Sequence, residues 1–194
     1  MKVSLSFPTS KTISTFLQKQ AKAKFTYHEL EGSKRSEVAG CDNDYSHRII
    51  GAGEADWEVA KEALRNWEQF PAPWTKILRE RTPLKKGETV AVLFRILGIW
   101  WINSARIVYD FDEPNRFGFA YGTLLGHLES GEECFWLERD VDGTVSYHIR
   151  AFSNPYYWFV KLAYPMARYY QRQFVLQSMA HMESVCAAAK KQRV

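Results

Sequence analysis

Apolar and polar residues alternate with a period of two along the middle of the chain, from residue 89 to residue 153. Such alternation places successive side chains on opposite faces of a β-strand. Short, turn-like joins interrupt the pattern, and the Asp142-Gly143 pair is typical of a hairpin turn. Because short joins connect antiparallel neighbours, the pattern predicts a five-stranded antiparallel meander. Its predicted strands cover residues 89–97, 104–112, 116–127, 132–140 and 144–153.

Apolar residues recur at helical spacing on both sides of this region. The spacing predicts helices at residues 10–21, 54–70 and 165–190. Pro71 and Pro73 are expected to end the second helix, because proline cannot continue it. Pro165 suits the first position of the third helix, where its missing N–H has no intrahelical partner.

Two further strands are expected before the meander, at residues 3–7 and 45–53, with a polar surface loop at 31–44. This order of elements predicts the α+β class, with a curved antiparallel sheet wrapped around the long C-terminal helix. Helices are expected on one face of the sheet, and the N-terminal strand and helix are extra elements. We expect this helix-grip arrangement to form a single domain over residues 1–194.

The predicted strand at 116–127 separates large residues from small ones. Its first half alternates three aromatic residues with three small residues, namely Phe117, Phe119 and Tyr121 with Gly118, Ala120 and Gly122. In one interpretation the small face lies beneath the C-terminal helix or a ligand, which can then approach the backbone closely. In the other interpretation the aromatic face lines a cavity. The alternation shows which residues share a face, and it leaves both interpretations open.

Composition narrows the class of protein. Aromatic residues make up 15% of the chain, which favours a large sheet, a ligand cavity or both. The formal net charge of +4 is small and its basic residues are scattered, so no nucleic-acid partner is expected. The three cysteines show no paired spacing and are expected to be free thiols. No signal peptide or long apolar run is evident, which predicts a cytoplasmic protein without membrane insertion.

Candidate chemistry gathers near the end of the aromatic strand, at His127, Glu132 and Glu133. An imidazole can act as a general base or a polar anchor near neutral pH, or it can simply cap the turn. The two adjacent glutamates face opposite sides of a strand, so at most one of them faces a cavity. A carboxylate on the apolar face beside Phe135 would need a cation. Arginines on neighbouring predicted strands, Arg95, Arg106 and Arg150, are available for an ion pair or for a ligand carboxylate or phosphate.

His148 shares a polar strand face with Arg150. This face is expected to contact solvent or a water-filled cavity. The five histidines show neither HxH nor HxxxH spacing, so no metal site is predicted. No nucleophile motif or phosphate loop is present, and no cofactor is expected. Trp100 and Trp101 follow a hairpin turn, and one of them is expected to be exposed at a rim.

Several long segments resemble one family, catalogued as domain of unknown function 1990 and as uncharacterised protein family 0548. They include GAGEADWEVAKEALRNWEQF, YPMARYYQRQF and the block FAYGTLLGHLESGEE, from Phe119 to Glu133. The loop EGSKRSEVAG departs from the family pattern. The family has no established activity, and its pattern looks like the START and birch-pollen-allergen superfamily of helix-grip proteins. That resemblance implies a cavity for a hydrophobic or amphipathic ligand between the sheet and the long helix.

Three functions remain open from the sequence. The first is binding of a hydrophobic or amphipathic small molecule, with ligand-binding candidates Arg106, Tyr121, His127, Glu133, His148 and Arg150. The second is an enzyme of the cyclase, hydrolase or isomerase kind, using His127 with Glu132 or Glu133. The third is a protein-interaction module that uses Trp100, Trp101 and the terminal helix.

Overall fold

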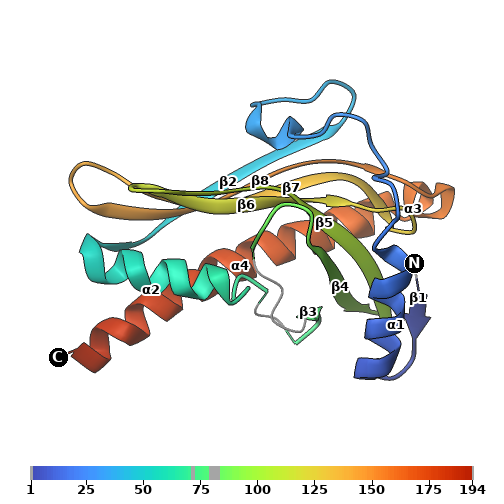
Figure 1. The fold of residues 1–194 in the computed structure, drawn as a ribbon, viewed down its shortest axis with the longest axis horizontal. Coiled ribbons are helices and arrows are strands. Elements are labelled where there is room, and N and C mark those ends of the chain that lie inside the picture. The colour runs from blue at the N-terminus through green and yellow to red at the C-terminus, as the bar shows by residue number, and fades with distance from the viewer. Residues whose placement is uncertain (1, 71–72, 79–83, 194) are drawn as a thin grey trace.

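The computed structural model describes residues 2–70, 73–78 and 84–193 and has a curled antiparallel sheet at its centre (Figure 1). Within these residues the strands follow the order β2-β8-β7-β6-β5-β4-β3, and β1 pairs with β5. The strands are β1 (Lys2–Ser4), β2 (Asp42–Ala52), β3 (Thr75–Leu78), β4 (Thr89–Ile96), β5 (Ile99–Glu113), β6 (Arg116–Thr123), β7 (Glu129–Arg139) and β8 (Thr144–Pro155). The helices are α1 (Ser10–Gln20), the 3₁₀ turn η1 (Gly32–Lys34), α2 (Gly53–Arg65), α3 (Trp158–Leu162) and α4 (Tyr164–Arg193).

The predicted meander and the long C-terminal helix are both confirmed. Strands β4 to β8 pair in sequence as antiparallel neighbours. Helix α4 lies along the concave face of the sheet together with α2 (Figure 1). Helix α1 lies on the other side, because Ile13 and Phe16 pack with Leu93 and Ile102. The expectation that the helices lie on one face was therefore wrong for α1.

Several boundaries differ from the prediction. Strand β5 begins at Ile99 rather than at residue 104, and β6 ends at Thr123 rather than at residue 127. Helix α2 ends at Arg65, because Trp67 takes a left-handed φ of 61° that a helix cannot contain. It therefore stops before the two prolines, of which Pro71 lies outside the described residues. The short strand β3 was not expected, since four residues show too little alternation. The polar segment before β2 contains η1, and β2 begins within it at Asp42.

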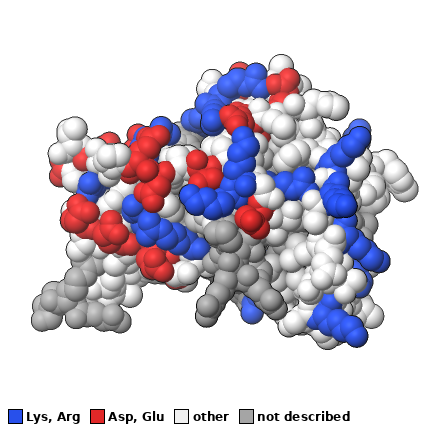
Figure 2. Space-filling view, in the orientation of Figure 1, with Lys and Arg blue, Asp and Glu red and all other residues white. Residues whose placement is uncertain are grey.

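The two faces of β6 have different coverings, and the aromatic face is the concave one. Phe119 and Tyr121 join the main core with Trp67 and Phe135, under α2 and α4. The small residues face the convex side, where Gly122 lies against the ring of Tyr27. The interpretation that placed the small face beneath the C-terminal helix was therefore wrong. A segment from the N-terminal part of the chain, including η1, covers that face instead (Figure 1). Its outer surface carries basic and acidic side chains in exposed ion pairs (Figure 2).

Candidate functional site

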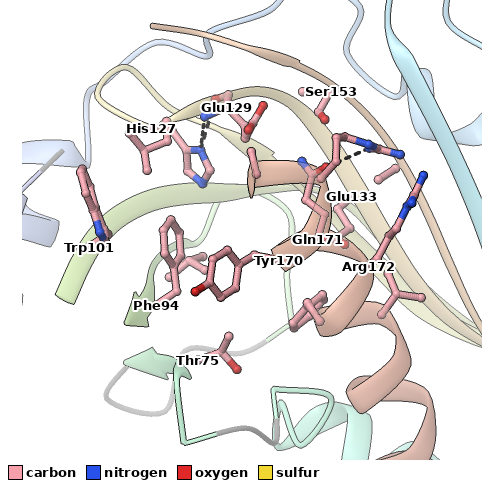
Figure 3. A pocket seen from close by; sticks show the side chains of 18 of the residues that line it. Thr75, Phe94, Trp101, His127, Glu129, Glu133, Ser153, Tyr170, Gln171 and Arg172 are labelled. Atoms are coloured by element: carbon pink, nitrogen blue, oxygen red, sulfur yellow. Dashed lines mark hydrogen bonds between the residues drawn. The ribbon is translucent and has the colours of Figure 1, made fainter. Parts of the chain in front are cut away.

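A cavity of about 580 Å³ lies between the concave face of the sheet and the first half of α4 (Figure 3). Small residues on opposing walls leave this space open. Gly131 and Ala151 lie on β7 and β8, Ala163 lies between α3 and α4, and Ala167 lies near the start of α4. Larger side chains at the three alanines would reduce the gap between sheet and helix. The remaining walls are mainly aromatic and aliphatic, with Phe70, Trp74, Phe94, Trp101, Tyr170 and Phe174 among them.

One polar group of the cavity is the pair formed by Tyr121 and Glu133. The two residues are direct cross-strand partners on β6 and β7. The Tyr121 hydroxyl donates to Glu133 Oε2 over 2.6 Å. Burial raises the pKa of Glu133 to about 7, while the hydrogen bond from Tyr121 opposes this rise and the negative charge of Asp44 adds to it. The carboxyl group is therefore poised to change charge near neutral pH.

A second polar group is His127, held in the turn between β6 and β7. The turn depends on Gly126, whose φ of +95° is readily adopted only by glycine. The backbone N–H of Glu129 donates to His127 Nδ1 over 3.0 Å, and the Glu129 carbonyl lies at 3.2 Å from the same atom. Because the amide hydrogen is fixed, Nδ1 accepts and the proton of the neutral ring sits on Nε2. That edge of the ring points into the cavity (Figure 3).

Both His127 and Glu129 are electrostatically perturbed. Burial lowers the pKa of His127 to about 4, so its imidazole is neutral at physiological pH. Burial, together with the negative charge of Asp42, raises the pKa of Glu129 to about 7, and Arg168 opposes the rise. Arg168 itself makes an ion pair with Asp44 through both guanidinium nitrogens, each 2.6 Å from a carboxylate oxygen. The cavity thus contains a neutral ring, two carboxyl groups that titrate near pH 7, the ion pair of Arg168 with Asp44, and the exposed Arg172 on α4 (Figure 3).

The structure places three of the predicted site residues on the convex side, away from the cavity. Arg106 donates to the carbonyl oxygens of Gln20 and Ala21 and so caps the C-terminal end of α1. His148 lies between the Tyr45 hydroxyl and Ser146 Oγ, at 2.9 and 2.7 Å from its ring nitrogens. Desolvation lowers the pKa of His148 to about 4.

Arg150 belongs to the same convex surface. Its guanidinium lies over the ring of Tyr45 at 5.0 Å and over the ring of Trp136 at 5.4 Å. The stacked rings include His148, whose centroid is 4.7 Å from that of Trp136. The ion pair expected between Glu133 and a strand arginine is thus not formed. Arg106 and Arg150 have other partners, and Arg95 is exposed.

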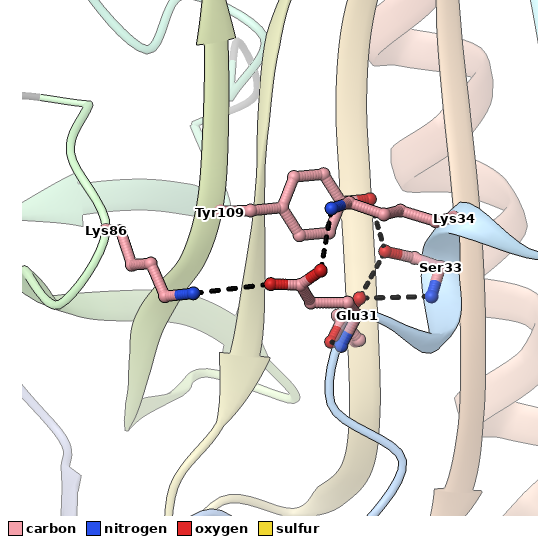
Figure 4. Close-up of polar contacts among 6 residues, drawn as sticks. Glu31, Ser33, Lys34, Lys86 and Tyr109 are labelled. Carbon is pink, nitrogen blue, oxygen red and sulfur yellow. Dashed lines mark hydrogen bonds and ion pairs between the residues drawn. The ribbon is translucent and has the colours of Figure 1, made fainter.

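Glu132 also faces the convex side, where it holds η1 against the sheet. Its carboxylate accepts hydrogen bonds from the Tyr27 hydroxyl at 2.8 Å, from the backbone N–H groups of Glu31 and Ser33 at 3.0 Å each, and from Ser33 Oγ. Ser33 Oγ also contacts the Tyr109 hydroxyl, and Glu31 pairs with Lys34 and Lys86 (Figure 4). Only one of the two adjacent glutamates therefore reaches the cavity, as the alternation of a strand requires.

The two tryptophans after the β4–β5 turn are not exposed at a rim. Trp100 is buried, and its ring contacts Phe7 edge to face at 5.1 Å. Trp101 faces the cavity, and its indole Nε1 is buried without a hydrogen-bond partner among the residues that the structure describes. The surface that the interaction hypothesis required of these residues is absent from the described part of the chain.

Sequence comparison assigns the chain to a family. A family model described as "Domain of unknown function (DUF1990)" matches residues 26–181. The chain belongs to the DUF1990 family. Two proteins named "UPF0548 protein" are similar along most of their length. The one from Dictyostelium discoideum is 34% identical over 90% of this chain and 91% of its own. The one from Deinococcus radiodurans is 36% identical over 87% of this chain and 94% of its own.

Structural comparison supports the helix-grip architecture of this DUF1990 protein. The crystal structure of Ara h 8.0201 aligns with a TM-score of 0.50, over 77% of this chain and 99% of that one. The sequence identity is 11%, so the likeness shows the fold alone. Among the described residues, no helix is long and apolar enough to cross a membrane. The same residues contain no group of three His, Cys, Asp or Glu side chains placed to hold a metal ion.

The sequence block that carries the DUF1990 resemblance contributes residues to both faces of the sheet. Tyr121, His127 and Glu133 reach the cavity, whereas Gly122 and Glu132 accommodate and bind the convex covering. Glu129 was missed, although it lies four residues before Glu133 and therefore shares its strand face. The α4 residues that line the cavity, such as Arg168, carry no sequence signal that links them to these strands.

Replacing Glu133 with glutamine should stabilise this DUF1990 protein at pH 8, by about 1 kcal/mol. The folded-state pKa of about 7 exceeds the ordinary glutamate pKa of 4.5. At a pH between these two pKa values, Glu133 is ionised in the unfolded chain but still protonated in the folded chain. The free energy of unfolding of the wild type therefore falls as the pH rises through this range. The variant lacks this decline, and its advantage should vanish at pH 4.5. Urea unfolding at both pH values measures the difference, and a smaller advantage at pH 8 than at pH 4.5 would contradict it.

Proposed function

We propose that this DUF1990 protein binds a hydrophobic or amphipathic small molecule in the cavity between the sheet and α4. The observation that carries the proposal is the cavity itself. Its volume of about 580 Å³ lies in the range typical of small-molecule sites. Its walls combine many apolar side chains with a few polar groups, which is the usual composition of such sites.

The polar groups of the cavity can form hydrogen bonds with a bound molecule. The His127 Nε2–H and Glu133 Oε1 have no hydrogen-bond partner among the described residues. The ring offers a donor and the carboxyl group offers an acceptor when ionised. Leaving such groups unpaired in an apolar cavity is unfavourable. A ligand that pairs with one or both would remove that penalty and would be amphipathic by this criterion.

Titration with Nile red, a neutral dye whose fluorescence rises in apolar surroundings, tests this proposal. We expect saturable binding to the wild-type protein with a Kd below about 100 μM, which corresponds to roughly 5.5 kcal/mol. The variant Ala151→Trp adds a large ring to a cavity wall and should weaken binding by at least about tenfold.

Ala188→Trp is the matched control, because Ala188 is exposed at the far end of α4 and does not line the cavity. It should bind the dye as the wild type does. Absence of saturable binding to the wild type would contradict the proposal, as would equal binding by the two variants when both are folded.

An enzyme of the cyclase, hydrolase or isomerase kind is the second candidate. The specific observation is that His127, Glu129 and Glu133 line one cavity with strongly shifted pKa values. Glu132 cannot take part, because its carboxylate is bound on the other face. The test is to recover a bound molecule and incubate it with fresh protein. Chemical change by the wild type but not by His127→Ala would support catalysis, and an unchanged molecule would count against it.

A further inference from the structure

Glu133 is a half-buried carboxyl group to which no cation is paired among the described residues. Its one hydrogen bond comes from Tyr121, and the described residues form no ion pair with it. Buried charges in proteins are normally paired, because removing an isolated carboxylate from water is very unfavourable. The side chain is nevertheless partly accessible, and the accessible part faces the cavity. A partner for this charge can therefore come from a molecule that occupies the cavity.

The basic residues of the cavity wall do not supply that partner. Arg168 is held by Asp44 through two hydrogen bonds and by Gln171 through a third, at 2.8 Å. Arg172 also lines the cavity, but its side chain is exposed on α4 and forms no ion pair with Glu133 among the described residues. Glu129 adds a second carboxyl group to the same strand, four residues away, and the described strand residues that line the cavity include no lysine or arginine.

Aromatic rings line the same cavity as the carboxyl group of Glu133. The ring of Tyr121, whose hydroxyl contacts Glu133, lies 6.5 Å from that of Phe70. Phe70 in turn lies 5.0 Å from Phe174 of α4, and all three rings line the cavity. Aromatic faces attract cations within about 6 Å of the ring centroid. Rings and a carboxylate together form an environment that favours an ammonium group over a neutral or anionic one.

We propose that the cavity selects a hydrophobic amine, whose protonated nitrogen pairs with Glu133 and whose apolar body fills the space beneath α4. This inference rests on the proposed binding function and narrows the ligand class. The ammonium group would donate to Glu133 Oε1, while Tyr121 keeps its bond to Oε2. A fatty acid or other anionic amphiphile would be repelled by both glutamates. A neutral alcohol would gain the same apolar contacts without the charge-assisted bond.

Displacement of Nile red by three probes of equal chain length tests the ligand class. The probes are decylamine, decan-1-ol and decanoate, each measured at pH 8 and pH 5.5. At pH 8 an alkyl ammonium resembles lysine, with a pKa near 10.4, and stays charged. Glu133, with a pKa of about 7, is mainly ionised at that pH. We expect decylamine to bind at least about tenfold more tightly than decan-1-ol at pH 8, and decanoate to bind most weakly. At pH 5.5 the carboxyl group is protonated, and the advantage of the amine should largely disappear.

Two variants test whether the preference for decylamine depends on Glu133. Glu133→Gln should abolish the advantage of decylamine over decan-1-ol, whereas Glu129→Gln should retain most of that advantage. The wild-type pH series needs no variant, so the inference stays testable even if Glu133→Gln folds poorly. Equal binding of decylamine and decan-1-ol at pH 8, or tightest binding of decanoate, would overturn the amine proposal and leave the binding function intact. Failure to bind Nile red at all would overturn both.

Discussion

Glu132→Gln should lower the free energy of unfolding by about 3 kcal/mol. The wild-type carboxylate accepts four hydrogen bonds, two from backbone N–H groups and two from hydroxyls of Tyr27 and Ser33. Glutamine has the same shape, but its amide group presents hydrogens where one carboxylate oxygen accepted them. The N–H and O–H donors at η1 would then face the N–H donors of the glutamine amide, and their hydrogen bonds would be lost. Urea unfolding measures the loss, and trypsin cleavage at Lys34 and Arg35 should accelerate because η1 leaves the sheet.

The adjacent residue provides a matched control for this prediction. Glu133→Gln makes the same chemical change one position along β7, but on the cavity face. At pH 8 it should stabilise the protein and leave the trypsin sites around η1 protected. The two substitutions should thus have opposite signs. If Glu132→Gln were neutral, or if both variants behaved alike, the assignment of the two glutamates to different faces would be contradicted.

Local patterns were sufficient to predict the long elements of this fold, but not β3 or η1. The period-two run predicted β4 to β8, and the helical spacing predicted α4, because each signal lies within one continuous segment. The covering of the convex face was not predicted. Its segment has no periodicity, and η1 is held by Glu132, about 100 positions further along the chain. A polar stretch of this kind looks like a surface loop until its distant partner is known.

Strand register explains which site residues the sequence could and could not assign. Tyr121, His127 and Glu133 lie close together in the sequence, and their shared position in the cavity follows from one strand pair. Arg150 pairs with Cys134 and therefore takes the face opposite to Glu133. Arg106 pairs with Gly122 and takes the convex face for the same reason. A shift of one residue in either pairing would have placed these arginines in the cavity, and the sequence does not specify the register.

Gly122→Val should lower the free energy of unfolding by about 2–3 kcal/mol. Gly122 is not among the glycines with positive φ, so its backbone accepts a side chain. The obstacle is space, since a Cβ atom at this position would lie against the Tyr27 hydroxyl and 2.7 Å from the ring carbon that bears it. The neighbouring Tyr121→Phe should cost only about 1 kcal/mol, because it removes a single hydrogen bond on the cavity face.

A double-mutant cycle with Tyr27→Ala identifies the cause of the Gly122 effect. In the Tyr27→Ala background the ring is gone, so the additional loss on Gly122→Val should fall below about 1 kcal/mol. Gly122→Ala should lie between glycine and valine in the wild-type background, because its methyl group already meets the tyrosine ring. Equal losses in both backgrounds would show that the valine disturbs β6 itself. In that case close packing against Tyr27 would not be the reason for a glycine at this position.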